Sequence, residues 1–172
     1  MNRRQQGKMA GPHFSGCGIF GAVVRAGVGE GRIDHVDWEA MRTSLAHRGP
    51  DDSDLWIDEN VGLGHTRLSI LDPRDCGRQP MVRGEFVITY NGEVYNYREL
   101  RAQLEGRGHR FTTNTDTEVV LNAFVEWGEA CLERFNGMFA FAIWNSRTRE
   151  LLLARDCLLY TSDAADDEER GG

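Results

Sequence analysis

Two stretches of this chain are apolar at odd and even positions alike, residues 17–24 and residues 138–144. A strand with one face in water alternates apolar and polar side chains, so an unbroken apolar strand has to be covered on both faces. Residues 151–154 have the same character, and residues 145–148 between the last two runs predict a hairpin turn. Residues 64–70 and 86–90 are two further strand candidates.

Apolar residues at helical spacing predict three amphipathic helices. Their stripes are Trp38, Met41 and Leu45; Tyr97, Leu100 and Leu104; and Val120, Ala123, Phe124 and Trp127. Asn96 with Glu99, and Thr115 with Glu118, have the spacing of a capping box at a helix start. Doubly buried strands interspersed with such helices indicate an α+β fold in which packed sheets are covered by helices.

The charge and the cysteines limit the kinds of partner and compartment. The net charge of −7 argues against a nucleic-acid or membrane partner, and five acids against one arginine put −4 of it in the last ten residues. No secretory or membrane-spanning segment is present, which favours a cytoplasmic protein without disulfides. The four cysteines are scattered, with no C-x-x-C pair: Cys17, Cys76, Cys131 and Cys157.

Cys17, at the start of the first apolar run, is a candidate nucleophile. A thiol attacks as the thiolate, and no histidine stands at a fixed spacing to take its proton. A freed α-amino group on Cys17 itself, with a pKa of about 7.7–8.0, would serve as the base. Taken alone, Cys17 is better explained as a small buried apolar residue than as a nucleophile, and only the neighbouring motifs reverse that interpretation.

Asn91 and Gly92 follow the predicted strand 86–90 and carry two interpretations. Asn-Gly after a strand is typical of a hairpin turn. Alternatively, the Asn91 amide and the Gly92 N–H point at a developing oxyanion, where each donor contributes roughly 2.7–4 kcal/mol to the transition state.

Arg67 and Asp116 are candidate anchors for a charged substrate. Arg67 closes an apolar strand, where an arginine either pairs with an internal carboxylate or grips a substrate carboxylate in bidentate fashion. Asp116 lies at a helix start, where an acid is expected for dipole reasons alone, and only beside the other motifs is it a candidate for an ammonium. Nothing has metal-ligand spacing, and residues 27–31 lack a phosphate-loop signature.

Taken together, these segments resemble the class II glutamine amidotransferase domain, in particular the amino-terminal glutaminase half of asparagine synthetases. The combined signal is specific, runs in family order and covers nearly the whole chain. The matching segments are residues 17–21, 47–51, 67–70, 91–96, 115–118, 137–141 and 154–156.

The resemblance implies an N-terminal-nucleophile hydrolase fold, a four-layer αββα sandwich of two mostly antiparallel sheets. It also implies that Cys17 attacks the side-chain amide of glutamine and that Asn91 and Gly92 hold the oxyanion. Arg67 would then bind the α-carboxylate, and Glu93 with Asp116 the α-ammonium. The products would be glutamate and ammonia, the latter passing to an ATP-dependent synthetase domain.

Three departures from the family pattern shape the expected domain organisation. Family members usually begin at the cysteine, so residues 1–16 are expected to be a leader or propeptide cleaved after Gly16, or a mis-called start or tag remnant. Residues 17–156 form the amidotransferase domain, and the acidic tail 157–172 is expected to be non-native or disordered. No ATP-pyrophosphatase motif is present, so no cofactor is expected in this domain, and ATP and Mg²⁺ belong to the absent synthetase domain.

Two other functions stay open at this point. In the first, the chain is catalytically silent because Cys17 is not N-terminal, and it only binds glutamine or a partner. In the second, it is a glutaminase that serves an acceptor other than aspartate. A homo-oligomer is also left open.

Overall fold

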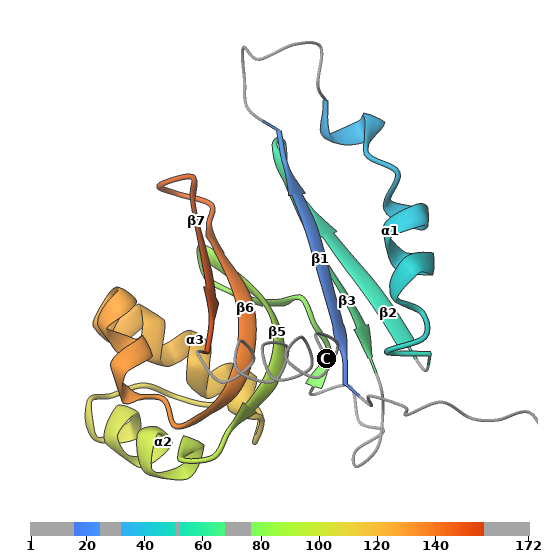
Figure 1. Ribbon diagram of the computed structural model, residues 1–172. Coiled ribbons are helices and arrows are strands. Elements are labelled where there is room, and N and C mark those ends of the chain that lie inside the picture. The colour runs from blue at the N-terminus through green and yellow to red at the C-terminus, as the bar shows by residue number, and fades with distance from the viewer. Residues whose placement is uncertain (1–15, 25–31, 51, 68–76, 157–172) are drawn as a thin grey trace, which may run out of the picture.

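The structure, a computed structural model, describes residues 16–24, 32–50, 52–67 and 77–156. Within them the strands form two antiparallel sheets (Figure 1), of order β1-β3-β2 and β4-β5-β6-β7. The first sheet consists of β1 Gly18–Val23, β2 Asp52–Ile57 and β3 Val61–Arg67. The second consists of β4 Met81–Arg83, β5 Phe86–Val94, β6 Gly137–Asn145 and β7 Glu150–Arg155.

Helices cover the outer face of each sheet (Figure 1). Helix α1, Trp38–Leu45, lies outside the first sheet, after the short 3₁₀ helix η1, Ile33–His35. Helices α2, Tyr97–Gly106, and α3, Asp116–Trp127, lie outside the second sheet, and the 3₁₀ helix η3, Gly128–Arg134, follows α3. The predicted α+β architecture of two antiparallel sheets is therefore confirmed, as are the three helices.

The interior is divided into two apolar cores. The larger one lies between the second sheet and its helices, where Ile88, Phe141 and Ile143 pack against Leu104 and Val120. The smaller one lies between the two sheets. It contains Val61, Leu63, Val87, Ala142 and Trp144. The Thr89 hydroxyl of β5 donates to the Gly64 carbonyl of β3 at 3.0 Å, which satisfies a buried polar group inside the smaller core.

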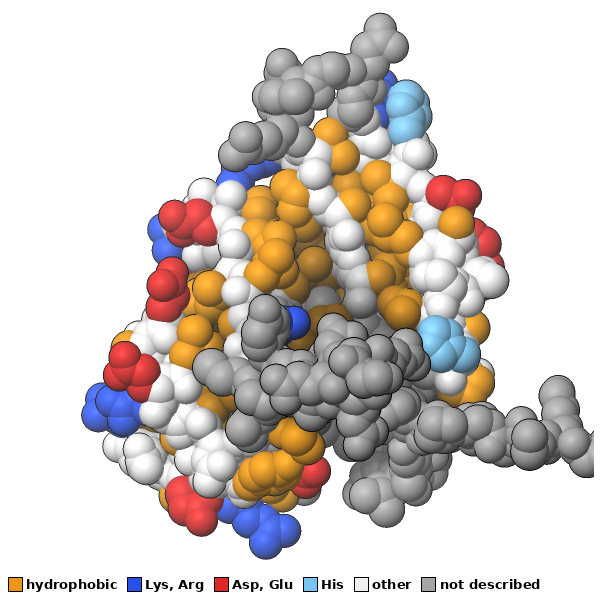
Figure 2. All heavy atoms as spheres, in the orientation of Figure 1, with side chains coloured by type: hydrophobic (Ala, Val, Ile, Leu, Met, Phe, Trp, Pro, Cys, Tyr) orange, Lys and Arg blue, Asp and Glu red, His pale blue; other side chains and the backbone are white. Residues whose placement is uncertain are grey.

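Burial on both faces holds for the central strand β6 but only in part for β1 and β7. In β6, residues 141–144 are all buried. By contrast, Val23 of β1 is 49% exposed and Leu153 of β7 is 70% exposed, because both strands are sheet edges with a neighbour on one side only. Residues of β1 and β7 border an apolar hollow of about 350 Å³. Figure 2 shows hydrophobic side chains gathered on the face of the molecule where these two strands lie.

Of the two residues predicted to cap a helix, Thr115 does so and Asn96 does not. Thr115 caps α3, since its hydroxyl accepts a 3.4 Å hydrogen bond from the Glu118 N–H. Asn96 precedes α2 without capping it, because its side chain binds the Asn136 N–H and the Arg134 carbonyl instead. The predicted hairpin at residues 145–148 is present between β6 and β7.

Several predictions fall outside the described residues. They concern residues 68–70 of the predicted strand 64–70, the leader before Gly16 and the acidic tail, so the boundaries 1–16, 17–156 and 157–172 stay predictions. Among the described residues, none of the helices has both the length and the apolar character needed to cross a membrane.

Candidate active site

A pocket of about 390 Å³ brings together five of the six predicted site residues. These are Cys17, Asn91, Gly92, Glu93 and Asp116. Gln79, Tyr90 and Thr117 also line it, with Gly16 and Met138 completing the wall. Its residues therefore come from the segment just before β1, from Gln79 before β4, from β5 and β6, and from the first turn of α3.

The position of Cys17 is fixed by the strand that follows it. The Gly18 N–H donates to the Thr66 hydroxyl at 3.1 Å, and that hydroxyl in turn donates to the Leu45 carbonyl at 3.4 Å. A Cβ at Gly18 would lie only 2.5 Å from the Thr66 oxygen, so the close approach requires glycine. Cys17 is a half-buried free thiol that faces the pocket, so burial among apolar residues does not account for it.

The hairpin interpretation of Asn91 and Gly92 is wrong. Strand β5 continues through both residues to Val94, with Asn91 opposite Ala140 and Gly92 opposite Phe139 of β6. Gly92 has φ +153°, and a Cβ there would overlap the Met138 carbonyl, so the strand passes this point only with glycine. The Asn91 Oδ1 lies 3.6 Å from the Cβ position of Gly16, which places this amide beside Cys17.

Asp116, the first residue of α3, is tied to β5 at two points. Its Oδ2 accepts a 2.6 Å hydrogen bond from the Tyr90 hydroxyl and a 3.2 Å hydrogen bond from the Val94 N–H. Burial first, and then the Asp116 carboxylate, raise the pKa of Tyr90, so its hydroxyl stays protonated as a donor. The helix start and the strand segment 91–93 are thus held in a fixed relationship.

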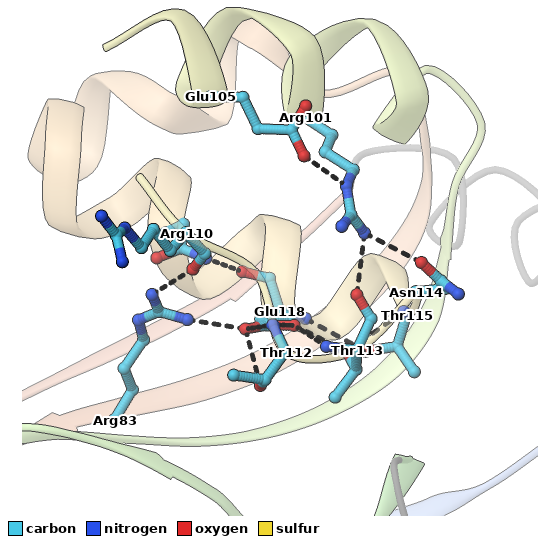
Figure 3. A network of polar contacts seen from close by, with 10 residues as sticks. Arg83, Arg101, Glu105, Arg110, Thr112, Thr113, Asn114, Thr115 and Glu118 are labelled. Atoms are coloured by element: carbon cyan, nitrogen blue, oxygen red, sulfur yellow. Dashed lines mark hydrogen bonds and ion pairs between the residues drawn. The ribbon is translucent and has the colours of Figure 1, made fainter. Parts of the chain in front are cut away.

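The loop before α3 is organised around the buried carboxylate of Glu118 (Figure 3). Thr112 and Thr113 each donate a backbone N–H and a hydroxyl to it, and Arg83 pairs with it at 2.6 Å. Burial alone would raise the pKa of Glu118, but these hydrogen bonds outweigh it and the pKa is lowered. Glu118 therefore fixes the loop that leads into Asp116 rather than reaching back to Thr115, as the capping-box pattern predicts.

Arg67 is the one predicted site residue that does not line the pocket. Its Nη2 lies 3.4 Å from the Cβ position of Gly77, and the Thr115 methyl group lies 3.8 Å from that same position. The guanidinium and Thr115, the residue before Asp116, therefore both lie beside Gly77.

Sequence reasoning gave no role to four residues that line the pocket, Gln79, Tyr90, Thr117 and Met138, nor to Arg48 beside it. Gln79 and Tyr90 line the pocket, and neither belongs to a pattern that would single it out. The Arg48 Nη2 lies 3.4 Å from the Cβ position of Gly16, and the buried Arg48 Nε has no hydrogen-bond partner among the described residues. The signal for Arg48 was its place in the family string 47–51.

No three His, Cys, Asp or Glu side chains within the described ranges come together as a metal site would need. The site therefore consists of a thiol, an amide, a backbone glycine and two carboxylates. This set can combine a nucleophile and oxyanion donors with anchors for a cationic group.

Comparison with known proteins gives consistent matches. A family model described as a glutamine amidotransferase domain matches residues 16–161. The asparagine synthetase (glutamine-hydrolyzing) 3 of Bacillus subtilis is 45% identical over 124 residues, which cover 70% of this chain and 20% of that protein. Asparagine synthetase (glutamine-hydrolyzing) 1 of the same organism is 38% identical over 141 residues, covering 81% of this chain and 22% of that protein.

A solved structure, the glutamine phosphoribosylpyrophosphate amidotransferase of B. subtilis with ADP and GMP, aligns with a TM-score of 0.49 and 25% identity. The alignment covers 58% of this chain and 24% of that one. The chain spans about a fifth of the length of the two asparagine synthetases.

Proposed function

Because this chain belongs to the glutamine amidotransferase domain family, we propose that it hydrolyses the side-chain amide of glutamine with Cys17 as nucleophile. The observation that carries the proposal is the single pocket on which Cys17, Asn91, Gly92, Glu93 and Asp116 converge. Five residues scattered over a hundred positions of sequence thereby come within reach of one small molecule.

The reaction begins once cleavage after Gly16 frees the α-amine of Cys17. That amine takes the thiol proton, and the sulfur bonds to the amide carbon while the oxygen becomes negative. The Asn91 amide and the Gly92 N–H hold this oxyanion. The carbon–nitrogen bond then breaks, ammonia leaves with the proton from the amine, and water hydrolyses the thioester to glutamate.

The charges around the pocket suit the other end of glutamine. Asp116 and Glu93 are the anchors for the α-ammonium, and the negative charge of each raises the pKa of Tyr90. Arg67, which lies beside Gly77 as Thr115 does, is the anchor for the α-carboxylate. The substrate would thus lie between the helix start and Cys17.

The ammonia is proposed to feed a separate ATP-dependent synthetase domain that makes asparagine in the cytoplasm. The support is that the relatives are named asparagine synthetases and are about five times longer than the matched region. ATP and Mg²⁺ would bind on that domain, and the fold of the present domain would be that of an N-terminal-nucleophile hydrolase.

An electrophilic diazo-ketone analogue of glutamine tests the proposal. We expect it to label Cys17, located by peptide mass, and expect Cys17→Ala to abolish both labelling and glutamate release. Cys131 is the internal control, since burial raises the pKa of its thiol to about 12 and keeps it protonated. Protein that binds glutamine without labelling at Cys17 would instead be the silent module.

The processing step has a separate test. Intact-mass analysis and N-terminal sequencing of active protein should give a chain that begins at Cys17. Glutaminase activity in protein that still carries residues 1–16 would rule out cleavage as the source of the base.

A further inference from the structure

Asp116 makes both of its observed hydrogen bonds through the same oxygen. The Tyr90 hydroxyl and the Val94 N–H both donate to Oδ2, and neither of the bonds found among the described residues involves Oδ1. Because Asp116 lines the pocket, a carboxylate held in this way by Oδ2 has Oδ1 available to a ligand.

The two donors are unequal in what they contribute. Val94 donates a backbone N–H at 3.2 Å, which any residue at that position would supply. Tyr90 donates a side-chain hydroxyl at 2.6 Å, a charge-assisted bond of the short and strong kind. Tyr90 is also 3% exposed and packed in the larger core, so the ring cannot move away from Asp116 without disrupting that core.

We propose that Tyr90 is a positioning residue that makes this pocket selective for ligands carrying an α-ammonium. Its hydroxyl fixes the Asp116 carboxylate so that Oδ1 faces the ligand at a set angle. The inference rests on the proposed function, because it takes glutamine as the ligand. It goes further by assigning part of the recognition of that ammonium to a residue that acts through Asp116.

The alternative is a purely structural role, in which the Tyr90 hydroxyl only stabilises the junction between α3 and β5. The two roles differ in what happens with a ligand that lacks the amine. A stabilising role affects all ligands alike, whereas a positioning role affects only those that place a cation on Oδ1.

The test is isothermal titration of the full chain with glutamine and with 4-carbamoylbutanoate, the same molecule without its α-amine. For Tyr90→Phe we expect affinity for glutamine to fall about tenfold and affinity for 4-carbamoylbutanoate to stay within about twofold of wild type. Asp116→Asn keeps an oxygen that accepts from Tyr90 and Val94 but removes the charge, and is expected to reduce the preference for glutamine further than Tyr90→Phe does.

Tyr97→Phe is the matched control. It deletes the same hydroxyl from a tyrosine at the start of α2, where the exposed Arg98 is the one donor to that hydroxyl within the part of the chain that the structure describes. It should leave both affinities unchanged. Thermal unfolding of each variant monitors the fold.

The outcomes separate the two proposals. Equal weakening of both ligands by Tyr90→Phe, or no weakening of either, overturns the role of Tyr90 while leaving glutamine as the ligand. A wild-type chain that binds 4-carbamoylbutanoate as well as glutamine, or that binds neither, contradicts the proposed function itself.

Discussion

The side-chain oxygen of Gln79 accepts a 2.6 Å hydrogen bond from the backbone N–H of Tyr90. The register that pairs Met81 with Ile88 would bring the backbones of Gln79 and Tyr90 opposite each other. Strand β4 begins only at Met81, however, and Pro80 has no N–H to contribute. The Gln79 side chain thus accepts the hydrogen bond that the backbone of a longer β4 would have accepted. The donor, Tyr90, directly precedes Asn91.

Gln79→Met should therefore destabilise the protein although it nearly conserves volume. It leaves the Tyr90 N–H buried without an acceptor, which costs about 1–3 kcal/mol in the free energy of unfolding. Urea denaturation measures the change, with Gln103→Met on the exposed side of α2 as control. Equal stability of the two variants would mean that the Gln79 bond contributes nothing.

Gly92→Ala is expected to be among the most damaging small substitutions in the site. The new Cβ would overlap the Met138 carbonyl at a φ of +153°, so strain and a steric clash add together. We expect a loss of more than about 3 kcal/mol in unfolding free energy, or insoluble protein. Gly84→Ala, where φ is +57° and nothing lies within 4 Å of the Cβ position, should cost only about 1–2 kcal/mol.

Glu118→Gln should loosen the loop that leads into Asp116. The amide cannot accept every donor that converges on Glu118, and Arg83 loses its partner, so we expect about 3–5 kcal/mol of destabilisation. Chemical denaturation of this variant is compared with Glu105→Gln, which breaks the half-exposed pair with Arg101 and should cost about 0.3–0.5 kcal/mol. A similar loss in both would contradict a special role for Glu118.

The lowered pKa of His65 should make the stability of the protein depend on pH. Burial, and then the Arg67 charge, lower the pKa of His65 from 6.5 to about 4. Between these values the unfolded chain binds a proton that the folded chain does not, so stability falls as the pH drops from 6.5 to 4. The loss is on the order of 3 kcal/mol.

Denaturation midpoints across that pH range measure this effect, and His65→Asn should flatten the profile. The exposed His35→Asn reports any general effect of removing a histidine. An unchanged slope in His65→Asn would mean that other groups cause the acid sensitivity.

How far the sequence predicts this molecule depends on whether a pattern is local. The stripe at Tyr97, Leu100 and Leu104 and the unbroken run of β6 carry their own periodicity, so the elements form where expected. Asn-Gly is locally typical of a turn, but pairing with β6 keeps β5 extended through Asn91 and Gly92.

The same limit applies to the surroundings of the site. Asn96 has the spacing of a cap, yet a partner 40 residues away takes its side chain. The roles of Tyr90 and Gln79 become visible only once α3 and the start of β4 are placed against β5. Predictions made from short motifs found the residues expected to do chemistry and missed those that hold them.

The Thr66 hydroxyl fastens the chain on the downstream side of Cys17, at the Gly18 nitrogen. Scission of the peptide bond on the upstream side would leave that anchor untouched. If the proposed cleavage after Gly16 takes place, it would expose the α-amine of Cys17 while the hydrogen bond at Gly18 stays in place, so a single cut would suffice and no refolding would be needed.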